Sequence, residues 1–365
     1  MNILFVSHDG DSLGLAMRTR EEGHPTTLYI ENERAAFVGN GLVVKPAFAR
    51  HLLKLNGEAV ASSINQLISE TSPDLIIIDS ARLGKVGDYL REKGRVVFGG
   101  SKWSDTLESS SGYASSVLRR IGIKTIELEL AGVEVECGAW WNGIELLSPY
   151  LALNEKRFMT GSLGCLVESA GNIVLSLPTK SLLFKKSMEL MKGMLKKSKW
   201  RGAISIKLIL NESDLGGVGF TVSTLYFPSL LETYKGSTVD LLWSIASGKR
   251  FEGEFTTDCA LSLLLSIPPY PLSMPAKNET LLGVSPSNLR YLHLLDVTKM
   301  VEVYETAVSD GRVAWVTARG RNIGEAKKRA YKTATNLQVT DLQYRTDIGD
   351  NAIVKLRKLR EWKWI

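Results

Sequence analysis

The chain has 365 residues, 44% of them hydrophobic and 23% charged, which excludes an intrinsically disordered protein and leaves room for two or three domains. Its formal net charge of +6 favours a polyanionic partner only weakly, because many enzymes are equally basic. No apolar run reaches the length of a membrane span, so we expect no membrane contact. Cys137, Cys165 and Cys259 lie far apart without metal-ligand spacing, so we expect free thiols, no metal site and a cytoplasmic location.

The first hundred residues alternate between apolar strands and helical patterns. Residues 2–7 predict a buried strand, not a signal peptide, and a turn through Gly10 leads into a helix. A strand, a glycine turn and a helix in this order point backbone N–H groups at an anion, although Asp9 and Asp11 beside the turn would repel one and favour a structural role. Further strands are expected at 27–30, 75–79 and 95–98. The alternation predicts a parallel, doubly wound domain.

The middle of the chain contains a predicted basic helix and a predicted hairpin. Residues 185–201 form an amphipathic pattern whose basic face is either solvated or in contact with nucleic acid. Residues 203–210 and 219–228 predict two strands joined by a glycine turn. The candidate nucleic-acid contacts on the helix are Lys185, Lys192, Lys196 and Lys199.

The last third of the chain predicts strands at 259–266 and 313–318, a helix at 325–335, and a basic, tryptophan-containing end. Basic segments with tryptophan can clamp a phosphate backbone while stacking on bases, but a terminal helix that docks its tryptophans on the core explains them equally well. The candidate nucleic-acid contacts here are Arg357, Arg360, Trp362 and Lys363.

Residues 311–349 combine an apolar strand, a glycine turn, a helix rich in Ala and Lys, and the loop Arg345-x-Asp347-x-Gly349. This order closely resembles the last domain of phosphoribosylamine–glycine ligase, the purine-pathway family that joins glycine to an amino sugar phosphate using ATP. Residues 98–125 also align well with the family, and residues 154–171 match it with an acid replaced by Ser162. The resemblance implies an α/β fold with a doubly wound parallel N-terminal domain (1–100), a reduced ATP-grasp-like central domain (101–250) and a mixed α/β C-terminal domain (251–365).

The resemblance also implies site residues. Lys156 and Arg157 would hold a leaving phosphate, Arg345 and Asp347 would contact phosphate and amine, and Glu134 or Glu136 would serve as base. The catalytic candidates are Glu134, Glu136, Lys156, Arg345 and Asp347. The substrate- and phosphate-binding candidates are Gly10, Gly99, Gly100, Ser101, Lys156, Arg157, Gly161, Gly164, Arg345 and Gly349.

Besides changes at Asp11, Ser12, Leu13 and Ser162, four departures from the family pattern fall on the ATP side. The small lobe that folds over the nucleotide is missing after Thr125, and serines replace the phosphate lysines at Ser111 and Ser115. Thr221 and Ser223 replace the metal-binding acid and amide, with Leu225 in place of an arginine. Neutral hydroxyls cannot neutralise a triphosphate–metal complex as a carboxylate does, so we expect that neither ATP nor magnesium is used.

Three functions remain open. The favoured one is an amino-acid transferase, with glycine as the first candidate, that joins an amine to a phosphorylated acceptor activated elsewhere, such as a phosphorylated nucleotide or a modified base in phage-type DNA hypermodification. The second is a non-catalytic binding or scaffold protein on this fold. The third is an ATP-dependent phosphoribosylamine–glycine ligase of purine biosynthesis.

Overall fold

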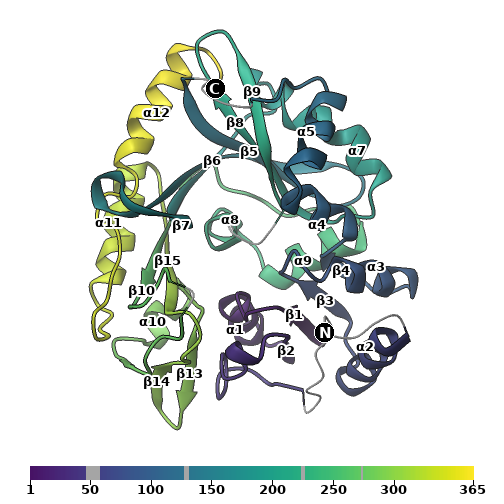
Figure 1. Ribbon diagram of the computed structural model, residues 1–365, viewed down its shortest axis with the longest axis vertical. Helices are drawn as coiled ribbons and strands as arrows, with labels where there is room; N and C mark the ends of the chain where they lie inside the picture. Colours follow the sequence, from purple (N-terminus) through teal and green to yellow (C-terminus); the bar gives the residue numbers. More distant parts are fainter. Residues whose placement is uncertain (47–57, 127–130, 223–226, 273) are drawn as a thin grey trace.

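The computed structural model describes residues 1–46, 58–126, 131–222, 227–272 and 274–365 (Figure 1). In these ranges the strands form a parallel sheet of four, an antiparallel sheet of eight and a small antiparallel sheet of three. The α/β class inferred from the sequence is confirmed. None of the helices in the described ranges is long and apolar enough to cross a membrane.

The parallel sheet has the strand order β2-β1-β3-β4. Its alternate residues face two separate clusters: Phe5 and Ile77 join the main core with Leu13 of α1, whereas Leu4 and Ile76 pack with α2 and α3. Both faces are therefore covered, as a doubly wound sheet requires. The elements are β1 (Ile3–Ser7), α1 (Leu13–Glu21), β2 (Thr26–Ile30), α2 (Glu58–Thr71), β3 (Leu75–Ile78), α3 (Gly84–Glu92) and β4 (Val97–Gly99), with a 3₁₀ turn at Glu33–Ala35.

The antiparallel sheet has the order β12-β15-β10-β7-β6-β5-β8-β9 and crosses residue 250, the predicted limit of the central domain. Its register joins β10 to β7, with Cys259 opposite Leu175 and Leu263 opposite Gly171. The strands are β5 (Val133–Trp141), β6 (Leu146–Met159), β7 (Leu163–Ser176), β8 (Gly202–Leu210), β9 (Leu215–Thr221), β10 (Cys259–Ser266), β12 (Leu292–Leu294) and β15 (Arg312–Gly320).

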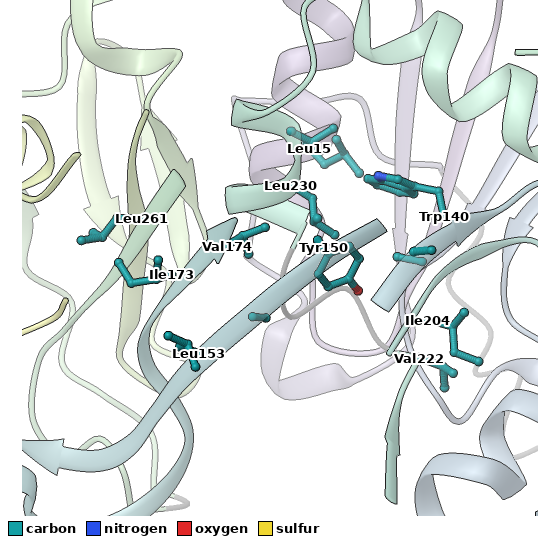
Figure 2. Packing of buried hydrophobic residues seen from close by; sticks show 14 of the residues in the cluster. Leu15, Trp140, Tyr150, Leu153, Ile173, Val174, Ile204, Val222, Leu230 and Leu261 are labelled. Carbon is teal, nitrogen blue, oxygen red and sulfur yellow. The ribbon is translucent and has the colours of Figure 1, made fainter. Parts of the chain in front are cut away.

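Helices join the two sheets and cover the large one. Figure 2 shows the shared core, in which Leu15 of α1, Leu230 of α8, Trp140 of β5 and Tyr150 of β6 belong to one buried cluster. The remaining helices are α4 (Lys102–Ser109), α5 (Ser111–Arg120), α8 (Phe227–Glu232), α9 (Thr238–Ser247), α10 (Pro286–Leu289), α11 (Ile323–Ala334) and α12 (Asp350–Glu361). The small sheet contains β11 (Thr280–Leu281), β13 (Val297–Met300) and β14 (Val303–Thr306).

The predicted basic helix over 185–201 is wrong as a single element. The chain forms α6 (Leu182–Lys185), a 3₁₀ turn (Met188–Met191) and α7 (Lys192–Lys197) instead. Ser187, with φ −135° and ψ −89°, breaks the helix, and its hydroxyl donates to the Leu183 carbonyl at 2.5 Å. The break lets both Met188 and Met191 enter the core, so packing outweighs the helical pattern.

The C-terminal tryptophans pack against the protein. Trp364 is buried, and its indole Nε1–H donates to the Asn211 carbonyl at 2.7 Å. The Trp364 carbonyl in turn accepts from the Leu183 amide at 3.0 Å, and Trp362 is partly buried against the core. Trp364 is therefore not available to stack on a base.

Candidate active site

A cleft of about 420 Å³ lies where the carboxyl ends of β1 and β3 face the large sheet. The carboxyl edge of an open parallel sheet is where α/β proteins bind ligands. The turn after β1, the segment after β3, strands β7, β8 and β15, and helix α8 all contribute to its walls. Its polar lining includes His8, Asp9, Asp11, Asp79, Arg82, Glu108, Glu168, Lys207, Tyr270, His293 and Arg312.

Asp79 is the carboxylate at the base of this cleft, directly after β3. It accepts hydrogen bonds from the Ser12 amide at 3.0 Å and from the Ser80 hydroxyl at 2.5 Å. Burial, with a smaller contribution from the charge of Asp11, raises the pKa of Asp79 to about 6. A carboxyl with this pKa is mostly ionised at neutral pH and still basic enough to take a proton from a substrate.

Glu168 of β7 provides a second acid in the same cleft. Burial raises the pKa of Glu168, and the negative charge of Asp11 raises it further. The cations Arg312 and Lys207 oppose this increase. The cleft therefore holds a buried carboxyl, Asp79, a more exposed one, Glu168, and two cations.

Arg312 neutralises the turn that follows β1. Its guanidinium donates to Asp11 at 2.8 Å and to Asp310 at 2.5 Å, and the two carboxylates outweigh burial to raise the pKa of Arg312. Burial also opposes ionisation of Asp9, but hydrogen bonds from Asn32 and His8 hold the pKa of Asp9 below its usual value. Both aspartates already have partners, so they repel an incoming anion less than their sequence suggests.

Arg82, His8 and Lys207 supply the other basic groups of the cleft. Arg82 Nη1 lies 3.4 Å from His8 Nε2, and His8 Nδ1 lies 2.8 Å from Asp9. Lys207 lies on β8, directly opposite Glu136 of β5. His293 is different, because burial and the nearby Arg18 lower its pKa to about 3 and keep it neutral.

Arg345, by contrast, lies outside the cleft lining and is fully engaged with the protein. It is 1% exposed, and it donates to both carboxylate oxygens of Asp347 at 2.8 Å and to the Arg157 carbonyl at 3.0 Å. Its guanidinium also lies 3.3 Å from Glu155. Asp347 additionally accepts from the Gly161 amide at 2.9 Å, so this loop ties α12 to the β6–β7 turn.

The other catalytic candidates of β5 and β6 also lie outside the cleft lining. Lys156 forms an ion pair with Glu134, and Arg157 donates to the Gly164 carbonyl at 2.8 Å. Glu136 is buried and accepts from the Ser205 hydroxyl at 2.6 Å. Among these residues Glu136 lies directly opposite Lys207, which lines the cleft.

The glycine turns separate into different places. Gly10 belongs to the turn that lines the cleft, and its amide donates to the Ser7 hydroxyl at 2.8 Å. The Gly99 amide donates to the Arg201 carbonyl at 2.8 Å, while Ser101 caps α4 and lines a separate cavity of about 400 Å³. Gly349, with φ +98°, precedes α12. Only the first of these turns reaches the cleft.

Except for the partly buried Trp362, the candidate nucleic-acid residues are exposed, but they do not form one continuous helix face. Lys192 lies 3.3 Å from Glu189, and Lys199 lies 3.0 Å from Glu92. Lys185 and Lys196 are exposed on α6 and α7, and Arg357, Arg360 and Lys363 are exposed at the C-terminal end. Two of the four candidate lysines between residues 185 and 199 therefore already have acidic partners.

The positions that would serve ATP lack charge in the described structure. Only residues 121–132 connect α5 to β5, and within them Thr125 pairs with Gly217. Thr221 is buried, and its hydroxyl has no hydrogen-bond partner among the described residues. Ser223 and Leu225 lie outside the described residues. Across the described ranges no group of three or more His, Cys, Asp or Glu side chains could hold a metal ion.

The main cleft residues were missed at the sequence level. Asp79 had a signal, because it ends an apolar strand at the edge where α/β sheets bind ligands. No sequence signal marked Glu168, Lys207 or Arg312 as cleft residues, because they reach the cleft from three strands that lie far apart in sequence.

Comparisons with known proteins agree with this fold. Residues 262–351 match the family model of phosphoribosylglycinamide synthetase, C domain. Phosphoribosylamine–glycine ligase from Helicobacter pylori is 21% identical over 95% of this chain and 96% of that protein. The ligase from Xylella fastidiosa is 30% identical, but the alignment covers 33% of this chain and 29% of that protein.

Solved structures show the same architecture. Phosphoribosylamine–glycine ligase from Thermotoga maritima has a TM-score of 0.70 at 18% identity, covering 95% of this chain and all of that one. The Kluyveromyces lactis urea carboxylase has a TM-score of 0.63 at 13% identity, covering 99% of this chain and 32% of that one. Residues 262–351 therefore match the C domain of phosphoribosylglycinamide synthetase, and the chain is similar to phosphoribosylamine–glycine ligases over nearly its whole length.

Proposed function

We propose that this chain is an amino-acid transferase, with glycine as its first candidate substrate, that joins an amine to a phosphorylated acceptor without using ATP. The observation that carries the proposal is the cleft, where Asp79 and Glu168 lie among Lys207, Arg82 and Arg312. A cleft with both signs of charge suits two substrates, a cationic amine and an anionic phosphate.

The carboxylates suit the amine substrate. An amino acid enters as an ammonium ion, and its nitrogen becomes a nucleophile only after losing a proton. Asp79, whose pKa is about 6, can accept that proton at neutral pH. Glu168 lines the same cleft, and its carboxylate can stabilise the positive charge of the amine.

The cations suit the acceptor. If the acceptor carries phosphate on an activated carbon, the amine nitrogen forms a bond to that carbon while the carbon–oxygen bond to phosphate breaks. The electron pair leaves with the phosphate, and Arg82 and Lys207 can stabilise its charge. No further reactant is needed, because the leaving group is already in place.

The short α5–β5 connection and the neutral Thr221 support the absence of ATP from this reaction. A nucleotide held between two lobes needs both of them, and a triphosphate with its metal needs carboxylate ligands. ATP use is tested by titration of the purified chain with Mg-ATP in a calorimeter. Tight binding would overturn the ATP-free reaction.

The transfer itself is tested by incubating the chain with labelled glycine and DNA that carries phosphorylated bases, with unmodified DNA as the control substrate. We expect label in the phosphorylated DNA only, and we expect Asp79→Asn to slow its incorporation strongly. Glu361→Gln, a change at an exposed acid of α12, is the matched control and should transfer normally. Label in neither DNA contradicts the proposed acceptor.

A second candidate is an ATP-dependent glycine ligase, which the nearly full-length alignment with the Helicobacter pylori ligase favours. The same calorimetric titration separates the two, since this candidate requires Mg-ATP binding. Formation of ADP in the presence of glycine and an amino sugar phosphate would then establish it.

A further inference from the structure

A second cavity, of about 440 Å³, is lined by Leu231 and Glu232 at the end of α8. The two share Leu231, which lines both. Strand β15 also runs past both, because Trp315 lines the cleft whereas Thr317 and Arg319 line the second cavity. In Figure 1, α8 is the short helix near the centre of the molecule. We call this second space the basic cavity.

Five cations line the basic cavity against a single acid. The acid is Glu232, which is 8% exposed and accepts from the Thr317 hydroxyl at 2.9 Å. The cations come from α1, β15, α11 and the end of α10, and they are Arg18, Arg290, Arg319, Arg329 and Lys332. Cations gathered this closely repel one another, and an anion bound among them would remove that cost.

Internal partners account for only part of this charge. Arg319 lies 3.5 Å from Asp258, Arg329 lies 2.6 Å from Glu325, and Arg18 lies 3.8 Å from Glu232. In the part of the chain that the structure describes, neither Arg290 nor Lys332 has a carboxylate within ion-pair distance. Arg18 Nη1 is buried without a hydrogen-bond partner there.

Two tyrosines give the basic cavity an aromatic wall. Tyr234 and Tyr291 both line it, and the Arg290 guanidinium lies 4.9 Å from the Tyr291 ring centre. Arginine and aromatic faces together are the surfaces on which nucleic-acid bases stack. Phosphate alone would need only the cations, so the tyrosines indicate a ligand that also carries a flat ring.

We propose that the basic cavity binds the phosphates and base of a nucleotide, either free or within a single strand. Arg290 and Lys332 hold the phosphates, and Tyr234 or Tyr291 contacts the base. The inference extends the proposed function by giving a nucleotide acceptor a binding place beside the cleft. It is tested by binding alone, so it can fail while transfer activity remains, and the reverse.

The test uses the full chain with two probes, a nucleoside diphosphate measured by calorimetry and a short labelled single-stranded oligonucleotide measured by fluorescence anisotropy. The double variant Arg290→Ala/Lys332→Ala should weaken binding of at least one probe by about tenfold or more, the loss expected when charge-assisted contacts are removed. Loss with the diphosphate indicates a free nucleotide, and loss with the oligonucleotide alone indicates a strand.

The matched control is Lys93→Ala/Arg95→Ala, which also removes one lysine and one arginine, both exposed and outside the cavity lining. It should bind each probe within about twofold of the unchanged chain, since distant exposed charges are screened by salt. An equal loss in both double variants would overturn the proposal. The proposal would also be overturned if neither probe bound the chain. It would be overturned as well if binding were lost only in Lys185→Ala/Lys196→Ala, which changes exposed lysines of α6 and α7.

Discussion

Asp79 and Arg345 are both buried charged residues, but their surroundings give them different roles. Arg345 donates hydrogen bonds to Asp347 and to the Arg157 carbonyl, both within the protein. Asp79 is held by Ser12 and Ser80 and still lines an open cleft. A buried ion pair closed on itself is compatible with a purely structural role, whereas a carboxyl with a raised pKa in a cleft is typical of a functional site.

The pH dependence of transfer should report Asp79. Its folded-state pKa is raised to about 6, so the carboxyl is protonated below pH 6 and cannot accept a proton from the amine. The rate should therefore rise by about tenfold per pH unit below 6 and level off above about 7. Initial rates from pH 5 to 8 measure this.

Asp79→Asn serves as the companion variant for that profile, because it keeps the shape of the side chain and removes the titration. It should be slow at every pH and lose the rise near 6. A variant that retains the rise would assign the titration to another group, of which Glu168 is the nearest candidate.

Arg345→Ala should destabilise the fold. The change leaves Asp347 without its cation and Glu155 with only the more distant Lys355 at 3.9 Å, and breaking such buried pairs costs about 3 kcal/mol. Denaturant unfolding measures the loss, and Arg95→Ala, at an exposed position, is the control. Lost transfer activity with unchanged stability would instead place Arg345 in the substrate site, as the family resemblance implied.

The contrast between these two residues also shows what sequence could predict. The Arg345-x-Asp347-x-Gly349 pattern was visible because its members are neighbours in the chain. The cleft was not, because Glu168, Lys207 and Arg312 meet only after β7, β8 and β15 have been placed around it. Residues that meet only in the folded protein leave no recognisable spacing pattern in the sequence.

At the scale of elements, strands with strong apolar runs were predicted well, and amphipathic helices less so. The expected strands at 75–79 and 259–266 correspond to β3 (Leu75–Ile78) and β10 (Cys259–Ser266). The expected strand over 219–228 ends at Thr221, and Pro228 belongs to α8. The prediction of a single helix over 185–201 is wrong because the chain leaves the helical conformation at Ser187. After this break Met188 and Met191 are buried in the core.

The contact between α1 and β12 depends on the absence of a side chain at Gly14. A Cβ at this position would lie 2.4 Å from the His293 Cα, a backbone atom that cannot move alone. Gly14→Ala should therefore lower the free energy of unfolding by about 1–3 kcal/mol, the usual cost of overpacking. Thermal and denaturant unfolding check this.

Gly112→Ala is the matched control for that change. Gly112 lies in α5, and no heavy atom lies within 4 Å of the place that an alanine methyl group would occupy there. Alanine is the better helix former, so this variant should gain about 0.5–1 kcal/mol. Equal behaviour of the two variants would show that α1 moves freely away from β12.

At the scale of the whole molecule, the large sheet contains strands from both the predicted central domain and the predicted C-terminal domain. The expected limit at residue 250 falls between α9 and β10, yet β10 pairs with β7 along five residue pairs. Figure 1 shows α11 and α12, late in the chain, running beside strands from its middle. Sequence patterns predict which segments form strands, but the pairing of β7 with β10 depends on contacts about ninety residues apart, as the register of Cys259 with Leu175 shows.

A fragment of residues 1–250 should therefore fail to fold on its own. Removing β10 exposes the Gly171–Leu175 edge of β7 together with apolar groups that β10 and α11 cover, and an uncovered apolar edge promotes aggregation. Size-exclusion chromatography should find the fragment aggregated, and thermal unfolding should lack a cooperative transition, whereas the full chain shows one. A monomeric fragment with a sharp transition would mean that the central domain is independent, and that the sheet joins two units which fold separately.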